Sequence, residues 1–99
     1  NNKVVVTHKF MKNIKRWTVV FRALANSNRL KIIKIFSSGR KINVGDIAKS
    51  VGISPKSASN HLAILKNLDV LESQGTAGRV FYSINPHIPK DFGKIFHSL

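Results

Sequence analysis

Residues 43–71 read NVGDIAKSVGISPKSASNHLAILKNLDVL, and they are the most informative part of the chain about its fold. Asn43 is positioned to cap a short helix, and Asp46 lies where a carboxylate meets the positive end of the helix dipole. Gly52 ends that helix, because glycine enters the left-handed conformation without steric cost. Between this cap and Gly52, four apolar residues share one face of the helix at the i, i+3, i+4 and i+7 spacing: Val44, Ile47, Ala48 and Val51.

A second helix is expected directly after this turn. Ser54 is its predicted N-cap, and Pro55 occupies the first helical position, where its missing N–H costs nothing. Two helices joined by a tight glycine turn are typical of the helix-turn-helix, whose second helix enters the major groove of DNA. The stretch therefore predicts a recognition helix that begins at Pro55.

The composition indicates one small domain with an anionic partner. The 99 residues contain 42% hydrophobic side chains, which suits a single core and a single domain over residues 1–99. Seventeen Lys and Arg against four Asp and Glu give a formal charge of +13, which implies a polyanion as partner. No acid precedes Asp46, so the N-terminal half is the more cationic.

Several classes of function are disfavoured. The chain has no cysteine, which excludes disulfides, thiolate metal sites and cysteine nucleophiles. Its longest apolar run, Leu62–Leu65, is far shorter than the roughly 20 residues of a membrane span. The carboxylates at positions 46, 69, 72 and 91 are scattered, and no nucleophile or phosphate loop accompanies them. We expect a cytoplasmic protein that is not an enzyme and has no membrane partner.

The flanking segments predict three more helices and a hairpin. A first helix runs from about Lys9 to Ala25, and a second follows a cap between Asn26 and Asn28. Val70–Gln74 and Arg79–Ile84 are rich in strand-forming residues and flank a Gly-Thr-Ala-Gly turn. A last helical stripe consists of Ile88, Phe92, Ile95, Phe96 and Leu99. The predicted fold is mainly α with a small β-hairpin, in the order α-α-α-α-β-β-α.

Three segments resemble the ArsR-type winged helix-turn-helix repressors. They read FRALANSNRLKI at 21–32, VGDIA at 44–48, and SNHLAIL at 59–65 running on to Val70 and Leu71. They occur in the order and at the spacing of that family, from about residue 17 to the C-terminus. The resemblance implies a homodimer built on the first and last helices, a recognition helix in the major groove, and a wing along the flanking backbone.

The resemblance also implies a repressor that is released by a signal, commonly a metal ion. The family's third-helix thiolate site would need cysteines where Asn43 and Gly45 stand, so that sensor is absent. The last-helix site of other members uses an Asp-x-His pair followed by further ligands about ten residues later. Asn85-Pro86-His87 and His97 echo this pattern, but Asn replaces the carboxylate and a fourth ligand is missing. We therefore expect no metal and no cofactor, with His87 and His97 as the only candidates, and the effector is not identified.

The recognition helix presents a polar surface. Ala58, Leu62 and Leu65 share a face that is expected to enter the core, which turns short polar side chains without acids outward. Asn can pair with adenine, Lys can donate to guanine, and Ser can hold phosphates. An ordinary solvated face would explain any one of these residues, but the set favours DNA contact: Ser54, Lys56, Ser57, Ser59 and Asn60.

Three further residues complete the predicted DNA-binding set. Thr76 and Arg79 flank the glycine turn, where an arginine suits a phosphate or a narrow minor groove. The alternative is an ordinary hairpin with one surface arginine. His61 lies at the edge of the apolar face, so a packed or backbone-bonded side chain and a phosphate contact are both open. Phe81 and Tyr82 alternate across the strand, so one of them is expected to pack on the core.

The first helix is amphipathic and cationic, and three roles are open for it. Its apolar stripe could form a dimer interface, the whole helix could lie on an anionic membrane, or its cationic face could contact DNA. We favour the dimer interface, as the resemblance implies. The predicted interface residues on the first and last helices are Phe10, Ile14, Trp17, Phe21, Phe92, Ile95 and Phe96.

The leading hypothesis is a homodimeric regulator of transcription, most simply a repressor, that binds double-stranded DNA sequence-specifically at an inverted repeat. The charge of +13 motivates an alternative, a winged-helix protein that binds DNA or RNA without sequence preference. A third hypothesis is an interaction module whose apolar end helices recruit a different protein. The operator, and the choice between repression and activation, are not given by the sequence.

Overall fold

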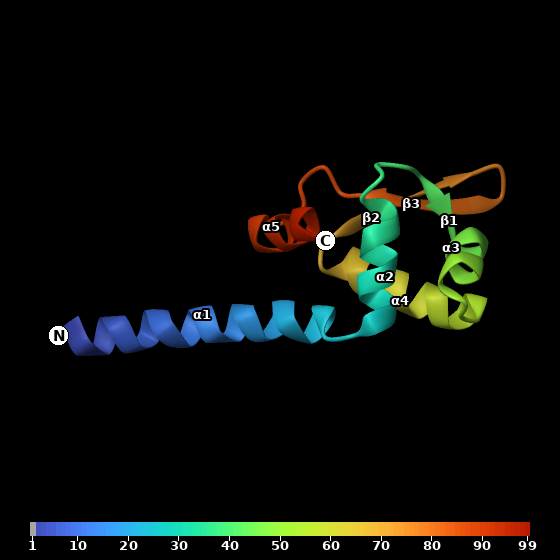
Figure 1. The fold of residues 1–99 in the computed structure, drawn as a ribbon. Coiled ribbons are helices and arrows are strands. Elements are labelled where there is room, and N and C mark those ends of the chain that lie inside the picture. The colour runs from blue at the N-terminus through green and yellow to red at the C-terminus, as the bar shows by residue number, and fades with distance from the viewer. Residues whose placement is uncertain (1) are drawn as a thin grey trace.

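The computed structural model describes the backbone of residues 2–99 and the side chains of residues 11–99. Figure 1 shows a long first helix that projects from a domain of short helices and strands, with overall extents of 58 × 23 × 23 Å. The elements are α1 (Asn2–Leu24), α2 (Ser27–Phe36), β1 (Ile42–Asn43), α3 (Val44–Val51), α4 (Pro55–Asn67), β2 (Leu71–Thr76), β3 (Arg79–Ile84) and α5 (Lys90–Ser98). The predicted order is confirmed, and α1 begins at Asn2 rather than near Lys9.

Polar side chains cap three of these helices. The Asn26 side chain accepts from the backbone N–H of Arg29 at 3.1 Å, which identifies the cap of α2. Asn43 and Ser54 cap α3 and α4 in the same way, as predicted. Gly52 ends α3 with φ of +79°, in the left-handed region that glycine tolerates best. These local interactions produce the helix-turn-helix from its own sequence.

The sheet has three antiparallel strands in the order β1-β3-β2. The short strand β1 pairs with β3 and was missed by the sequence analysis, because two residues carry no alternation. Thr76 pairs directly with Arg79, so β2 runs to Thr76 and not to Gln74. The predicted four-residue turn is therefore wrong: Ala77 and Gly78 alone form it, with φ of +52° and +76°, as in a type I′ hairpin.

The core lies between the helices and one face of the hairpin. Ala58, Leu62 and Leu65 of α4 are fully buried, which confirms the predicted inner face of that helix. Tyr82 packs against the core, as expected for one of the two aromatic residues of β3. The buried set is Val20, Ala23, Leu24, Ile32, Ile33, Phe36, Ile47, Ala48, Ala58, Leu62, Leu65, Val70, Leu71, Phe92 and Phe96.

Two residues predicted at a dimer interface belong to this core. Phe92 and Phe96 of α5 are 2% and 7% exposed, so their rings are covered by their own chain. The sequence pattern marks an apolar helix face without saying whether that face packs inside one chain or between two. Here α5 uses its apolar face within the protomer.

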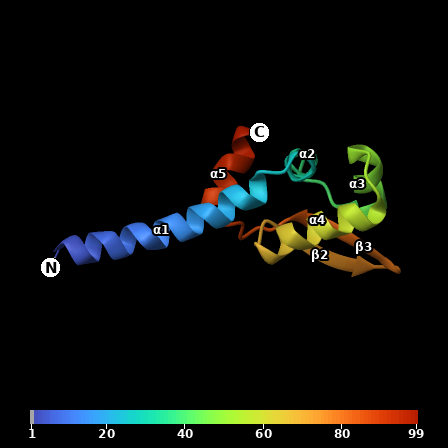
Figure 2. The same cartoon turned by 90° about the horizontal axis from the view of Figure 1, so that it is seen from below.

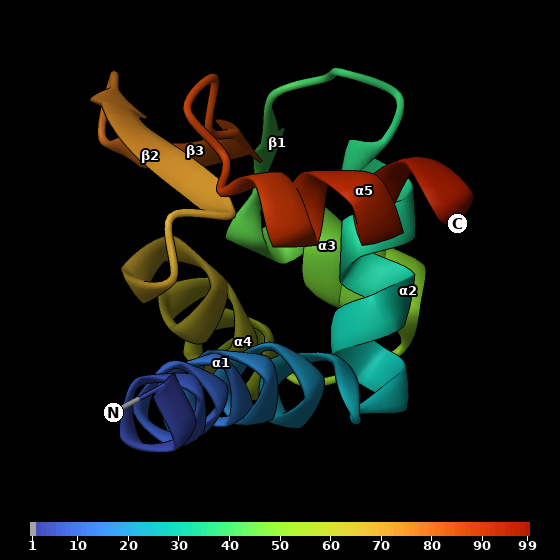
Figure 3. The same cartoon turned by 90° about the vertical axis from the view of Figure 1, so that its left-hand side faces the viewer.

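The two ends of the molecule have different characters. Figure 2 shows α3, α4 and the hairpin at the end farthest from the N-terminus of α1. Figure 3 looks along α1 from that N-terminus and places α1 and α5 on the near side. The helix-turn-helix and the free N-terminal part of α1 therefore lie at opposite ends of the molecule.

Candidate nucleic-acid interface

The outward face of α4 is short, polar and free of acids. Ser54, Lys56, Ser59 and Asn60 are exposed, and Ser57 is half-buried. Ser54 is also the N-cap: its Oγ accepts from the backbone N–H of Ser57 at 3.1 Å. The structure thus brings all five residues together on the first two turns of α4. This surface fits the hydrogen-bonding edges of bases in a major groove.

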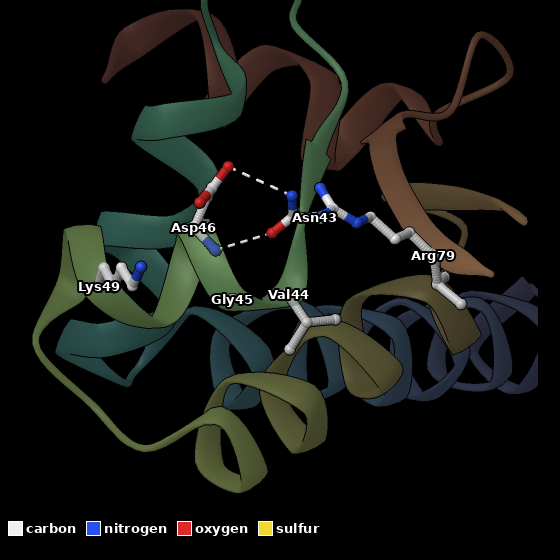
Figure 4. A pocket seen from close by; sticks show the side chains of 7 residues that line it. Asn43, Val44, Gly45, Asp46, Lys49 and Arg79 are labelled. Carbon is white, nitrogen blue, oxygen red and sulfur yellow. Dashed lines mark hydrogen bonds between the residues drawn. The ribbon is translucent and has the colours of Figure 1, made fainter. Parts of the chain in front are cut away.

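The hairpin contributes a second surface. Thr76 and Arg79 form the last strand pair before the turn, and both are exposed. Arg79 also lines a groove of about 470 Å³ between the hairpin and α3. In Figure 4 its side chain extends from β3 toward the N-terminal end of α3. The arginine therefore belongs to a groove as well as to the hairpin tip.

The groove has a second cation that the sequence analysis missed. Lys49, on the last turn of α3, lines it together with Arg79. The carboxylate of Asp46 is also present, but the Asn43 amide donates to it at 3.2 Å and the N-terminus of α3 faces it. Lys49 gave no signal in the sequence, because a lone lysine on a short helix is usually only solvated.

The positions of the family's thiolate site hold a helix cap instead. Asn43 accepts from the backbone N–H of Asp46 at 2.8 Å, and a Cβ added to Gly45 would lie 3.4 Å from Asn43 Oδ1. His87 and His97 are both exposed, and Asn85 Oδ1 is used by the backbone N–H of His87. Within the part of the chain that the structure describes, no three His, Asp or Glu side chains are grouped to hold a metal ion.

His61 faces inward along α4 and contacts an arginine of α2. Its Nδ1 lies 3.3 Å from Nη1 of Arg29, and both side chains are half-buried. Burial lowers the pKa of His61 below its ordinary value, and the neighbouring charge of Arg29 lowers that pKa further. This is the packed arrangement among the alternatives for His61. Arg29 itself was not among the predicted functional residues.

The long helix α1 exposes an apolar surface. Ile14, Trp17 and Phe21 are 46%, 44% and 59% exposed, and the rings of Trp17 and Phe21 stack with centroids 5.5 Å apart. Large apolar side chains gathered in this way mark interaction surfaces. Ile95 of α5 is half-buried. Phe10, also predicted at the interface, lies outside the residues whose side chains are described, as does His8.

An ion pair joins α1 to α5. Arg16 donates from Nε to Asp91 Oδ2 at 2.7 Å and from Nη2 to Oδ1 at 3.0 Å. Its guanidinium lies 5.4 Å from the centroid of the Phe92 ring. The hydrogen bonds from Arg16 lower the pKa of Asp91, although partial burial of that carboxyl opposes the effect. The sequence places Arg16 among the cations of α1, and its partner is not visible there.

The comparisons with known proteins agree with this geometry. A sequence profile of the arsR family of bacterial regulatory proteins matches residues 26–73, which run from the cap of α2 into β2. The transcriptional repressor SdpR of Bacillus subtilis (strain 168) is 35% identical over 72 residues, which are 73% of this chain and 79% of SdpR. The chain belongs to the arsR family. It is a DNA-binding regulator of transcription, and the predicted resemblance is confirmed.

Solved structures support the same fold for this ArsR-family protein. Reduced HlyU from Vibrio cholerae N16961 superposes with a TM-score of 0.78 at 24% identity, over 92% of both chains. The winged helix-turn-helix DNA-binding domain of Mb0332 from Mycobacterium bovis, described as homodimeric and as a possible ArsR-family regulator, gives 0.72 at 27% identity. That match covers 91% of this chain and 80% of the other.

Among the helices that the structure describes, none combines the length and the apolar character that a membrane crossing would require.

Proposed function

We propose that this ArsR-family regulator is a homodimer that binds an inverted repeat in double-stranded DNA and represses transcription by occluding a promoter. The observation that carries the proposal is the placement of two complementary surfaces at one end of the molecule. α4, whose outward residues include no acid, lies beside the hairpin at the end of the molecule away from the free end of α1 (Figure 2). Lys56 and Asn60 would read bases, and Arg79 would hold a phosphate.

The proposed dimer rests on α1. Ile14, Trp17 and Phe21 form an apolar face that remains about half exposed in the single chain. A second copy would bury these side chains and place two α4 helices against successive major grooves, about 34–36 Å apart. The Mb0332 domain of Mycobacterium bovis is homodimeric, which agrees with this assembly.

Repression is the direction that we favour, since SdpR is named a transcriptional repressor. HlyU of Vibrio cholerae serotype O1, 27% identical over 88 residues, is named a transcriptional activator. Those residues are 89% of this chain and 81% of that relative. A reporter gene placed downstream of the DNA sequence that this protein binds most tightly decides between repression and activation. Occlusion predicts lower expression when the regulator is present.

The deciding experiment is selection of bound sequences from a random duplex pool, with and without zinc, followed by competition binding. An inverted repeat bound roughly 10³-fold more tightly than random DNA supports the proposal. Enrichment that does not depend on zinc supports a regulator without the family's metal sites.

A second candidate function is binding of nucleic acid without sequence preference, and the charge of +13 favours it. The same competition assay separates the two functions. A ratio near one against both random duplex and structured RNA would support the second function and contradict the first.

A further inference from the structure

Arg29 lies where three helices meet. It belongs to the first turn of α2, and its guanidinium reaches both the end of α1 and the middle of α4. Nε donates to the carbonyl of Ala23 at 2.6 Å, and Nη2 donates to the carbonyl of Arg22 at 3.3 Å. One half-buried side chain therefore connects the long helix to the recognition helix.

The bonds to α1 act as a helix cap. The last four carbonyls of an α-helix have no partner within the helix, and those of Arg22 and Ala23 belong to this group in α1. A cation at this end also compensates the negative end of the helix dipole. The position of Arg29 is thereby fixed by the end of α1.

The third contact of Arg29 is with His61, which is adjacent in sequence to the proposed DNA-binding residue Asn60. Nη1 of Arg29 lies 3.3 Å from Nδ1 of His61, the residue that follows Asn60 on α4. Arg29 can only donate, so Nδ1 must be unprotonated to accept this hydrogen bond. The lowered pKa of His61 agrees with a neutral ring.

Direct packing between α1 and α4 is incomplete beside this contact. A mainly apolar groove of about 250 Å³ separates the two helices, lined by Val19, Arg22 and Ala23 of α1, by Ile64 and Leu68 at the end of α4, and by Arg29. The apolar contact between the two helices is confined to the buried core, which includes Val20 and Leu24 of α1 and Leu62 of α4. The polar bridge through Arg29 adds a directional contact on the groove side.

We infer that Arg29 is a positioning residue: through His61 it sets the rotation of the recognition helix relative to the helix that carries the proposed dimer interface. The inference rests on the proposed function, since a dimer that reads two half-sites needs both α4 helices at a fixed rotation. Without the bridge, α4 loses this restraint on its rotation, and only small turns remain open to it because Ala58, Leu62 and Leu65 stay packed in the core. The protein then loses specificity for the repeat while its attraction to phosphates remains.

Acidification has the same effect in the unmodified protein. Protonation of His61 removes the acceptor of the hydrogen bond from Arg29 and places a second cation beside that arginine. Arg22 of α1, which lines the groove between α1 and α4, is a further cation nearby. α4 contains no acid, and its other charged side chains are Lys56 and Lys66. The bridge is therefore present above about pH 6.5 and is lost as the pH falls through the lowered pKa of His61.

The test compares Arg29→Gln with Lys31→Gln, which removes the same charge from an exposed site on the same helix. The quantity measured is the ratio of affinities for the selected operator and for random duplex. We expect Arg29→Gln to lower this ratio about tenfold, the size of one lost charge-assisted hydrogen bond, and Lys31→Gln to leave it unchanged. Equal ratios for the two variants would overturn the inference.

A second variant separates positioning from a merely structural role. His61→Asn puts an amide oxygen where Nδ1 stands, so the acceptor is kept and the titration is removed. The wild-type ratio should hold above about pH 6.5 and fall as the pH is lowered further, while that of His61→Asn should stay level. A parallel fall in both proteins would contradict the mechanism, even if Arg29→Gln fails to fold.

A DNA-free measurement distinguishes failure of this inference from failure of the proposed function. The ¹⁵N shifts of the Arg29 guanidinium should titrate together with the His61 ring, and they should stop doing so in His61→Asn. Co-titration with a wild-type affinity ratio near one would reject the sequence-specific function and keep the bridge. If the ¹⁵N shifts of Arg29 do not change as His61 titrates, the hydrogen bond between the two side chains is contradicted, whatever the DNA affinities are.

Discussion

Arg16 and Asp91, which are 75 residues apart in the chain, form a two-point ion pair that fastens α5 to α1. Both N–H donors of this contact come from one rigid guanidinium, whose plane also lies near the ring of Phe92. The pair adds a polar contact between α1 and α5 to the apolar packing of Val20, Ala23 and Leu24 in the core. The orientation of the proposed dimer surface is thus supported by residues that are distant in the chain.

Replacing Asp91 by Asn should lower the free energy of unfolding by about 0.5–1 kcal/mol at neutral pH, because the pair is partly exposed to solvent. The folded state lowers the pKa of Asp91, so the contribution is present above the ordinary pKa of the carboxyl. It is lost as the pH falls through the lowered value. Urea unfolding at a series of pH values measures it, with Glu72→Gln as a control for charge. A wild-type advantage that persists in strong acid would contradict the assignment.

Trp17→Ala should weaken the dimer by about 2 kcal/mol or more, since a large aromatic residue at the centre of an interface carries much of the binding energy. The ring is 44% exposed in the single chain, so the fold itself should change little. Sedimentation velocity over a range of concentrations measures the dissociation constant. Lys15→Ala, on an exposed site of the same helix, should leave it unchanged. Identical dimer affinity for the two variants would remove Trp17 from the interface.

In contrast to Trp17→Ala, Phe92→Ala should destabilise the fold of the single chain rather than weaken the dimer contact directly. This ring is 2% exposed in the core of one chain, and its loss should cost about 3–5 kcal/mol of folding free energy. Thermal unfolding of a dilute sample reports the change. A variant with a native melting temperature and impaired dimerisation would return Phe92 to the interface that the sequence pattern suggested.

The DNA-binding residues should separate into two groups. Lys56→Ala and Asn60→Ala, made separately, should each reduce discrimination between operator and random DNA by about 1–3 kcal/mol. Arg79→Gln should weaken binding to all sequences and reduce the slope of log affinity against log salt by about 0.9. Fluorescence anisotropy at several salt concentrations measures both quantities. Unchanged discrimination in the two α4 variants would show that the assigned reading surface is wrong.

Gly52→Ala tests the turn of the helix-turn-helix. A Cβ at this position meets no atom within 4 Å, so any cost comes from the φ of +79° alone. We expect a loss of about 1 kcal/mol. Gly75→Ala is the matched control, because that glycine is not in the left-handed region and has room for a methyl group. Chemical unfolding of both variants gives the comparison, and equal effects would refute the conformational explanation.

Elements that depend on near neighbours could be predicted from the amino-acid order alone. Asn43, Gly52 and Ser54 act within four residues of their own positions, so the caps and the turn were predictable. The apolar spacing of α4 likewise predicted its buried face of Ala58, Leu62 and Leu65. Because the local rules agree with one another, the helix-turn-helix and the family resemblance were both visible in the amino-acid order.

The tertiary structure decided which apolar faces pack within one chain and which remain exposed. The stripes of α1 and α5 look alike in sequence, yet Phe92 is buried while Trp17 and Phe21 are not. A helical spacing of apolar residues predicts that one face is apolar, but it does not indicate which surface packs against that face. The strand β1 was invisible for a related reason, since its two residues gain their structure only by pairing with β3.

Folding also determines where individual cations lie relative to distant segments of the chain. In the sequence, Arg16, Arg29 and Lys49 are three of seventeen basic residues, and even the family-like segment that contains Arg29 does not reveal the contacts of that side chain. Folding places Arg16 on Asp91, Arg29 between α1 and His61, and Lys49 beside the groove of Arg79. The geometry of these contacts depends on segments that are distant in the chain, and local sequence rules describe only what lies within a few residues.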